Sequence, residues 1–268
     1  MTRVYDVVRT LQDYRAIKWS ERANSSGTAG TYLKARVGAG TRARYLKLSR
    51  FTGVEIDGSE CVNEIAASRL MSLLGIEHLE YRLIHALVNV DGTEFETWLN
   101  SSKNFRRRGE QKMGLGTYFE LRRREGEDPY AFCVRLGWEE RIAQMMLVDY
   151  LIANRDRHAS NIEVIIAPTG ETRLAPVFDN GMSLLAPYGA DLERIAAFDP
   201  LMDVATTNFV GERSLEENVR AHPWRPARPL CETDRAYLLA GLEDAAPAVL
   251  LDKIWEIIWK RWCWYEAL

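Results

Sequence analysis

The sequence predicts an α+β fold with two lobes, a small β-rich lobe over residues 1–90 and a larger, mainly helical lobe over residues 91–268. Short β-rich segments dominate the first ninety residues. Beyond them, apolar residues recur at helical spacing, most clearly over residues 141–153 and 248–268. A chain of 268 residues, of which 47% are hydrophobic, is long enough to bury a substantial core.

The strands of the small lobe are predicted from residue type and from the breaks between them. Residues 31–37 and 42–49 are both rich in residues that favour β-structure. The sequence Gly38-Ala39-Gly40 lies between them and is typical of a hairpin break. We therefore expect two neighbouring strands at the start of this lobe.

One helix and one further strand complete the small lobe. Apolar side chains recur at helical spacing over residues 59–74, and Gly75 follows at the position expected of a C-terminal cap. Residues 81–90 are an apolar, strand-like run, and the turn sequence Asp91-Gly92 comes directly after it. We place the boundary between the lobes at this turn.

The larger lobe begins with an unusually polar stretch. Residues 100–127 include two arginine clusters, at positions 106–108 and 122–124. We interpret this stretch as a solvated loop and helix face. The alternative is a docking surface for an acidic partner.

Apolar patterns predict the other elements of this lobe. Residues 141–153 are apolar almost all round, as expected of a helix buried at the centre of a lobe. Residues 162–166 and 173–178 bracket the turn sequence Pro168-Thr169-Gly170, which indicates a β-hairpin. Residues 248–268 form a last helix, and one of its faces carries three aromatic side chains typical of core packing: Trp255, Trp259 and Trp262.

Composition and charge exclude several classes of protein. The formal net charge is −3, so no global positive field attracts nucleic acid or an anionic membrane. Because no apolar run resembles a signal peptide or reaches the ~18 residues of a membrane span, we expect a cytoplasmic protein without direct nucleic-acid or membrane binding. The cysteines lack zinc-site spacing and are expected to be reduced thiols in the core: Cys61, Cys133, Cys231 and Cys263.

The densest polar group lies between the buried helix and the hairpin, at residues 154–161. Asp156 and Asn161 share this loop, so a carboxylate can serve as base for a hydroxyl while an amide oxygen holds a metal. The hairpin brings back a second carboxylate, Asp179, and such oxygen ligands suit Mg²⁺. Taken singly, each of these residues can also be a turn former. His158 lacks a second ligand at zinc-site spacing, and we expect it to fix the loop by hydrogen bonds.

The small lobe offers groups that suit phosphates. Lys47 is an isolated charge in an apolar strand, and Glu64 on the following helix can pair with it; the alternative for Lys47 is an exposed residue on an edge strand. Small residues before the first strand let backbone N–H groups approach phosphate oxygens, without the Gly-Lys-Ser/Thr ending of a P-loop: Ser25, Ser26, Gly27, Thr28, Ala29 and Gly30. The chain order of these groups is the order of the parts of a protein kinase.

The sequence resembles the HipA family of bacterial serine/threonine kinases over residues 25–184. Residues 147–161 are similar to the family pattern of an apolar helix that leads into Asn-x-Asp-x-His-x-x-Asn. Residues 174–179, Leu-Ala-Pro-Val-Phe-Asp, are similar to its Pro-x-Tyr/Phe-Asp motif, and the Ser183-Leu184 pair follows as in the family.

The resemblance implies a protein-kinase-like fold, ATP and Mg²⁺ as cofactors, and transfer of the γ-phosphate to a hydroxyl of a protein substrate. By this resemblance Asp156 is the catalytic base, and Asn161 and Asp179 hold the metal. Lys47 then contacts the nucleotide phosphates, and Glu64 orients it. The residues expected to contact the nucleotide are Ser25, Ser26, Gly27, Thr28, Ala29, Gly30, Lys47, Glu64 and His158.

The resemblance also bears on regulation and partners. It implies an antitoxin or other regulatory partner, but we expect the additional N-terminal subdomain of HipA toxins to be absent from this chain. The loop carries Ser25 and Ser26 where eukaryotic kinases have Gly-x-Gly-x-x-Gly. Because members of the family can be autophosphorylated in or near this loop, these serines are candidate modification sites.

Two other functions stay open at this point. A kinase-like enzyme can act on the hydroxyl of a small molecule, such as an antibiotic or a lipid headgroup, because a fold does not decide a function. A non-catalytic module can also bind the nucleotide as a structural ligand. Such a pseudokinase is expected to lack Lys47, Asp156 or Asp179, and all three are present.

Overall fold

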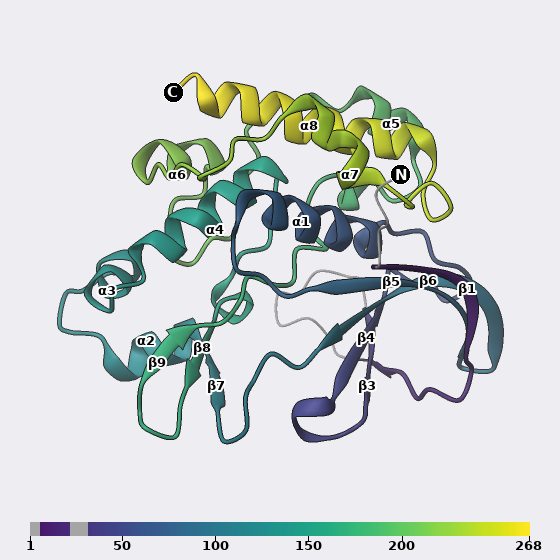
Figure 1. The fold of residues 1–268 in the computed structure, drawn as a ribbon, viewed down its shortest axis with the longest axis horizontal. Helices are drawn as coiled ribbons and strands as arrows, with labels where there is room; N and C mark the ends of the chain where they lie inside the picture. The colour runs from purple at the N-terminus through teal and green to yellow at the C-terminus, as the bar shows by residue number, and fades with distance from the viewer. Residues whose placement is uncertain (1–5, 22–31) are drawn as a thin grey trace.

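The computed structural model describes residues 6–21 and 32–268. Figure 1 shows a sheet and a group of helices as two parts of the molecule, with helix α1 (Glu60–Leu74) lying between them. The small-residue loop at 25–30, which the sequence predicts to bind phosphates, lies outside the described residues.

The small lobe is built on one mixed sheet with the strand order β1-β5-β6-β4-β3-β2. β1 and β5 pair in parallel, and the other neighbours are antiparallel. The predicted strands at 31–37, 42–49 and 81–90 are confirmed as β3, β4 and β5. The strands are β1 (Val7–Tyr14), β2 (Ser20–Glu21), β3 (Leu33–Val37), β4 (Arg44–Leu48), β5 (Tyr81–Val90) and β6 (Thr93–Lys103), with a short 3-10 helix at Gly40–Arg42.

Helix α1 is buried along almost its whole length, because it packs between the sheet and the helices of the large lobe. The predicted cap is confirmed. Gly75 has a left-handed φ of 72°, and its N–H bonds to the carbonyls of Met71 and Ser72. Glycine adopts this conformation without the steric cost of a Cβ, so the helix ends here.

β6 carries the sheet past the predicted boundary between the lobes. It pairs with β5 along its length, and the turn at Asp91-Gly92 joins the two strands. A division at residue 90 therefore falls inside a hairpin, and we propose instead that the lobes divide after Lys103. The expectation that residues 100–127 are solvated is wrong at its start, since Asn100 is buried in β6 between β4 and β5.

The large lobe is mainly helical, as predicted. Helix α4 is its centre, and every residue from 142 to 151 is buried, which confirms the buried helix. The helices are α2 (Leu115–Arg122), α3 (Pro129–Arg135), α4 (Glu139–Leu151), α5 (Leu192–Ala197), α6 (Leu215–Ala221), α7 (Arg235–Leu239) and α8 (Ala248–Glu266), with 3-10 turns at Ala159–Asn161, Ala186–Tyr188 and Glu232–Asp234.

A second sheet, of three antiparallel strands in the order β7-β8-β9, lies at the lower edge of the large lobe (Figure 1). Its strands are β7 (Gln111–Gly114), β8 (Glu163–Ile166) and β9 (Thr172–Leu174). The predicted hairpin is confirmed, but β9 ends before Pro176, which has no N–H to continue the ladder. Val177 instead bridges to His78, just before β5, and so links the two lobes.

The last helix agrees with expectation, and the thiols agree in part. Trp255 and Trp262 of α8 are buried and Trp259 is partly buried, as in a core stripe. All four cysteines are free, but the expectation of core thiols is wrong for Cys231 and Cys263, which are exposed, while Cys61 and Cys133 are buried. None of the described helices is long and apolar enough to cross a membrane.

Candidate active site

Lys47 of β4 lies where the two lobes meet. β4 has β3 and β6 as neighbours, so the alternative of an edge-strand lysine is wrong. The Lys47 Nζ is 2.7 Å from Asp179 Oδ1 and 3.7 Å from Glu64 Oε1. The same amine lies 5.1 Å from the centroid of the Tyr32 ring. One strand lysine is therefore close to carboxylates from α1 and from the large lobe.

Glu64 ties helix α1 to the segment that follows Asp179. Its side chain is buried, and its Oε2 accepts a hydrogen bond of 3.0 Å from the backbone N–H of Asn180. The preceding residue on α1 is Asn63, and its side-chain amide donates to the carbonyls of Gly181 and Ser183. Movement of α1 would therefore move both Lys47's partner and the loop that carries Asp179.

Asp179 stands at a sharp change of chain direction. It follows the extended segment after β9 and has a φ of 57°, in the left-handed region that few residues other than Gly, Asn and Asp adopt. Its N–H donates to the Tyr81 hydroxyl at 3.2 Å, which helps to hold this conformation. Asp179 is therefore a turn residue and also the predicted site residue, so these two interpretations of the sequence are compatible.

The polar loop after α4 is ordered by two asparagine side chains. Asn154 donates to Asp149 Oδ1 at 2.8 Å and accepts from the Asp156 N–H at 3.2 Å. The Asn161 amide nitrogen donates to the Asp156 carbonyl at 2.8 Å. The amide oxygen of Asn161 is then the atom left to bind a cation.

The Asp156 side chain is 23% exposed at the edge of this loop. Its Oδ1 lies 3.4 Å from Thr207 Oγ1 and 3.7 Å from His158 Nε2. His158 Nδ1 accepts a hydrogen bond from the Ser160 N–H at 3.1 Å, which leaves Nε2 facing Asp156. His158 therefore bonds within the loop and lies beside the predicted base.

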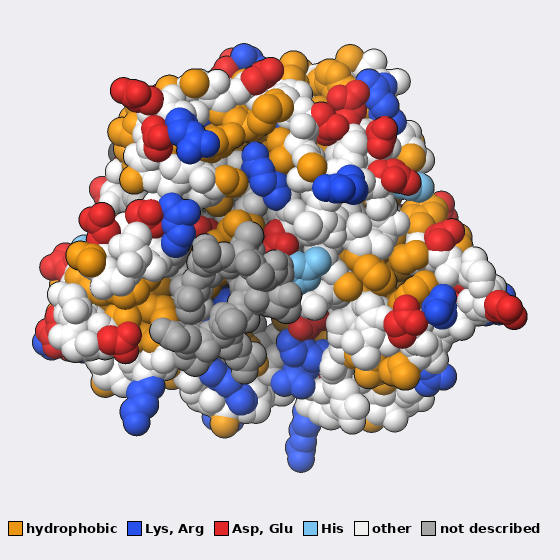
Figure 2. Space-filling model, turned by 180° about the vertical axis from the view of Figure 1, so that it is seen from behind, with side chains coloured by type: hydrophobic (Ala, Val, Ile, Leu, Met, Phe, Trp, Pro, Cys, Tyr) orange, Lys and Arg blue, Asp and Glu red, His pale blue; other side chains and the backbone are white. Residues whose placement is uncertain are grey.

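One cavity of about 440 Å³ between the lobes has Lys47, Asp156, Asn161 and Asp179 in its wall. Figure 2, which views the molecule from behind, shows acidic and basic side chains interspersed over this face. The other lining residues are Tyr32, Lys34, Tyr45, Leu46, Leu79, Tyr81, Asn100, Ser102, Lys103, Asn104, Phe105, Lys112, His158, Ser160, Glu163, Phe178 and Met182. Glu64 does not line it and acts from behind Lys47.

Several residues of this cavity were missed in the sequence. Lys34 pairs with Lys47 in the register of β3 and β4. Its position between the apolar residues Leu33 and Ala35 is the sequence pattern that could have indicated it. Glu163 and Lys112 form an ion pair of 2.6 Å in the wall. No local sequence pattern predicts this ion pair, because its two residues lie on different strands, β7 and β8.

The charges of the site control one another's protonation. Burial lowers the pKa of Lys47, but the attraction of Asp179 and Glu64 outweighs it and holds that pKa well above its usual value. Burial raises the pKa of Asp179, but the positive charges of Lys47 and Lys34 lower it by more, so this pKa lies below its usual value. Burial also raises the pKa of Glu64, and Lys47 only partly offsets the effect. Lys47 and Asp179 are thus a charged pair at neutral pH.

The donor set of the cavity fits Mg²⁺. The residues that would hold the ion are Asn161, through its amide oxygen, and Asp179, through its carboxylate. Mg²⁺ binds through oxygen donors of one or two carboxylates and keeps several positions for water and phosphate oxygens. Within residues 6–21 and 32–268, no cluster of three or more His, Cys, Asp or Glu side chains is arranged to hold a metal ion.

Comparison with known proteins identifies the fold. No protein-family model matches the chain, and no curated protein matches it significantly. Among solved structures, the chain is similar to the Helicobacter pylori proinflammatory kinase CtkA, with a TM-score of 0.53, 15% identity and 93% of both chains covered. The chain has a protein-kinase-like fold. The two-lobe fold predicted from the resemblance to HipA-like kinases is therefore confirmed.

The chain is also similar to HipA of the Shewanella oneidensis MR-1 toxin–antitoxin system, in complex with HipB and operator DNA. The TM-score is 0.41 and the identity 16%, over 90% of this chain and 57% of that one.

Proposed function

We propose that this protein is an ATP- and Mg²⁺-dependent phosphotransferase, a HipA-like serine/threonine kinase that transfers the γ-phosphate to a protein hydroxyl. One observation carries the proposal. Lys47, Asp156, Asn161 and Asp179 come from three separate segments of the chain and line a single cavity between the lobes. Phosphoryl transfer needs a cation at the phosphates, metal ligands and a group that orients the acceptor, and this set supplies each of them.

Each lysine and each carboxylate of the site has a role that follows from its position. Lys47 binds phosphate oxygens, and Glu64 keeps its amine in place from behind. Lys34, beside Lys47 in the sheet, adds a second positive charge on the same wall. A bound Mg²⁺ would neutralise phosphate charge between Asn161 and Asp179. Asp156 accepts the proton of the acceptor hydroxyl as the hydroxyl oxygen bonds to the γ-phosphorus. The bond between that phosphorus and the bridging oxygen breaks, and ADP leaves.

The apolar part of the cavity suits the nucleoside. Phe105 and Phe178 lie with ring centroids 5.9 Å apart in its wall, at a tilt of 33°. Leu46, Leu79 and Met182 add apolar surface. An aromatic and aliphatic lining of this kind favours a planar base, with the charged groups at the phosphate end.

Incubation with γ-labelled ATP and Mg²⁺, with and without a proteome extract, tests the proposal. Label on this protein or on extract proteins is expected for the wild type and is expected to be lost in Asp156→Asn. Asp252→Asn, whose side chain is 64% exposed on α8, is the matched control. Label only on small molecules would favour a small-hydroxyl kinase. Nucleotide binding without any transfer would favour a pseudokinase.

Autophosphorylation at Ser25 or Ser26 is a proposal from sequence, because the loop lies outside the described residues. A phosphate adds roughly −1.5 to −2 charges and would repel the nucleotide phosphates near Lys47. Mass spectrometry of wild type and Asp156→Ala separates a switch from simple turn formation. Phosphate only in the active form supports the switch, and an unmodified loop in an active preparation contradicts it. An antitoxin-type or other regulatory partner is likewise proposed from the family resemblance alone.

A further inference from the structure

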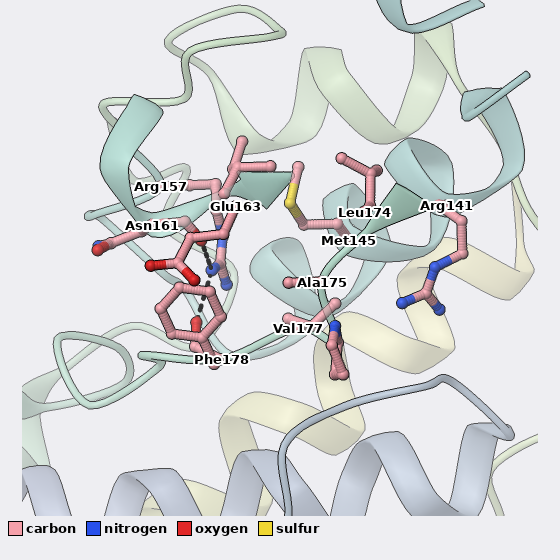
Figure 3. Close-up of a pocket in the computed structure, with 11 residues that line it drawn as sticks. Arg141, Met145, Arg157, Asn161, Glu163, Leu174, Ala175, Val177 and Phe178 are labelled. Carbon is pink, nitrogen blue, oxygen red and sulfur yellow. Dashed lines mark hydrogen bonds between the residues drawn. The ribbon is translucent and has the colours of Figure 1, made fainter. Parts of the chain in front are cut away.

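Arg157 is a fully buried arginine directly after the proposed catalytic base. It does not line the large cavity between the lobes. It lies instead behind that cavity, in the wall of a small one of about 20 Å³ (Figure 3). Its side chain is 0% exposed, so it cannot contact a substrate.

One side of the guanidinium is held by a buried carboxylate on α4. Arg157 Nη2 donates to Asp149 Oδ1 at 2.7 Å, and Nε donates to Oδ2 at 2.9 Å. Asp149 is 0% exposed as well, and Asn154 donates to it from the side. A two-point contact of this kind fixes both the position and the plane of the guanidinium.

The other side of the guanidinium reaches both segments that carry the proposed metal ligands. Nη1 donates to the Phe178 carbonyl at 2.9 Å and to the Asn161 carbonyl at 3.4 Å, the two bonds drawn in Figure 3. Nη2 donates to Asn180 Oδ1 at 2.6 Å. Arg157 thus bonds to Asn161 itself and to both neighbours of Asp179.

The chemistry of this contact requires arginine. Five donors in a planar fork can bond to a carboxylate on one side and to three oxygens on the other, which a lysine amine cannot do. A buried ion pair is weak evidence for stability, since hydrophobic residues of similar volume often serve as well. The contribution of the Asp149–Arg157 pair to the site is therefore the geometry that it imposes on the residues around it.

We propose that Arg157 is a positioning residue that sets the spacing between Asn161 and Asp179 and thereby the affinity of the site for Mg²⁺. This inference rests on the proposed function, because it assigns a purpose to the same site. It makes Asp149 the anchor of the proposed metal ligands, although Asp149 lies on α4 and its side chain bonds to Arg157 and Asn154.

The test measures Mg²⁺ binding apart from activity. Thermal unfolding is followed with a non-hydrolysable ATP analogue at increasing Mg²⁺, for wild type, Arg157→Lys and Arg261→Lys. Arg261 is the matched control, because it is equally buried but donates to the carbonyls of Tyr150, Pro200 and Met202 inside the helical lobe. In Arg157→Lys the half-saturating Mg²⁺ concentration should rise about 10–100-fold, the usual effect of losing a group that supports metal ligands. Binding of the analogue without Mg²⁺ should change less than about twofold.

A milder variant covers the case in which Arg157→Lys does not fold. Asn180→Ala removes one acceptor and leaves the pair with Asp149, and it should raise the Mg²⁺ requirement in the same direction. An Mg²⁺ requirement within twofold of wild type in the folded variants overturns this inference and leaves the proposed function standing. Failure of the wild type to bind any nucleotide overturns the proposed function, and this inference with it.

Discussion

Two groups of charged side chains meet at this site, and they differ in exposure and in origin. Lys47, Glu64 and Asp179 come from β4, α1 and the segment after β9, and the side chains of Lys47 and Asp179 are 14% and 27% exposed. Asp149 and Arg157 both belong to the large lobe and are 0% exposed. In the first group Lys47 and Asp179 line the cavity and Glu64 is buried behind Lys47, while the second group lies behind the cavity wall.

The difference separates a replaceable contact from a fixed one. Lys47 and Asp179 keep some exposure in the cavity wall, so phosphate or metal can reach their charged groups. A fully buried pair cannot release one partner without leaving an uncompensated charge in the interior. The inter-lobe group is therefore suited to bind ligands, and the buried pair is suited to hold the residues that do.

Removal of Asp149 should have the largest effect on the molecule as a whole. In Asp149→Ala, Arg157 stays charged and buried without its carboxylate, and the free energy of unfolding should fall by about 3–5 kcal/mol. Urea unfolding measures the loss. Asp252→Ala, which breaks an exposed pair with Arg235, should cost less than about 1 kcal/mol. Equal losses in the two variants would remove the distinction between the groups.

Asp156→Asn tests the chemical step at the same cavity. Turnover should fall about 10²–10⁴-fold, because the acceptor hydroxyl loses its base. Nucleotide affinity should stay within about twofold, because the role proposed for Asp156 is toward the acceptor and not the nucleotide. Steady-state kinetics with isothermal titration separates the two quantities. Strongly weakened nucleotide binding with unchanged turnover would instead assign Asp156 to the metal or to loop structure.

Asp179→Ala tests whether the inter-lobe pair is replaceable. The variant should still fold, since the Glu64 carboxylate stays 3.7 Å from the Lys47 amine and continues to compensate its charge. It should lack nucleotide-dependent activity. It should also lack the stabilisation by Mg-ATP, which amounts to about 2.7 kcal/mol at a ligand concentration of 100 Kd. Retention of both the thermal shift and the activity would exclude Asp179 from the metal site.

A surface pair far from the cavity should show the smallest effect. The hydrogen bond from Arg135 lowers the pKa of Glu127 to about 2. Since the folded-state pKa is depressed, the contribution of Glu127 is present above its ordinary value and is lost as the pH falls toward 2. Glu127→Gln should therefore unfold more easily than wild type near pH 6, and the two stabilities should converge near pH 2. Parallel curves from pH 6 to pH 2 would show that the pair does not contribute.

Local patterns were sufficient wherever neighbours in the chain decide the structure. The strand at 81–90, the cap at Gly75 and the buried helix before the polar loop all follow from spacing and residue type. β6 was missed because its polar residues, Asn100 among them, resemble a solvated segment. Their burial comes from strands on both sides.

The candidate site was predictable only in part for the same reason. Asp156, Asn161 and Asp179 stand in dense polar sequences next to apolar elements, which marks them. Glu163 and Arg157 lie in the same part of the sequence, but no local pattern indicates their roles. The wall position of Glu163 depends on Lys112 from another strand, and the position of Arg157 depends on Asp149 from the preceding helix.

The sequence by itself determined the order of the parts: a strand lysine, a helix glutamate, a polar loop with Asp156 and Asn161, and a hairpin that ends in Asp179. Each part follows from residue type and periodicity over a few positions. Only the tertiary structure decided that Lys47 and Asp179, 132 residues apart, are in contact at 2.7 Å. Such a contact depends on how α1 packs between sheet and helices. Packing is a property of complementary buried surfaces, which no short stretch of sequence contains.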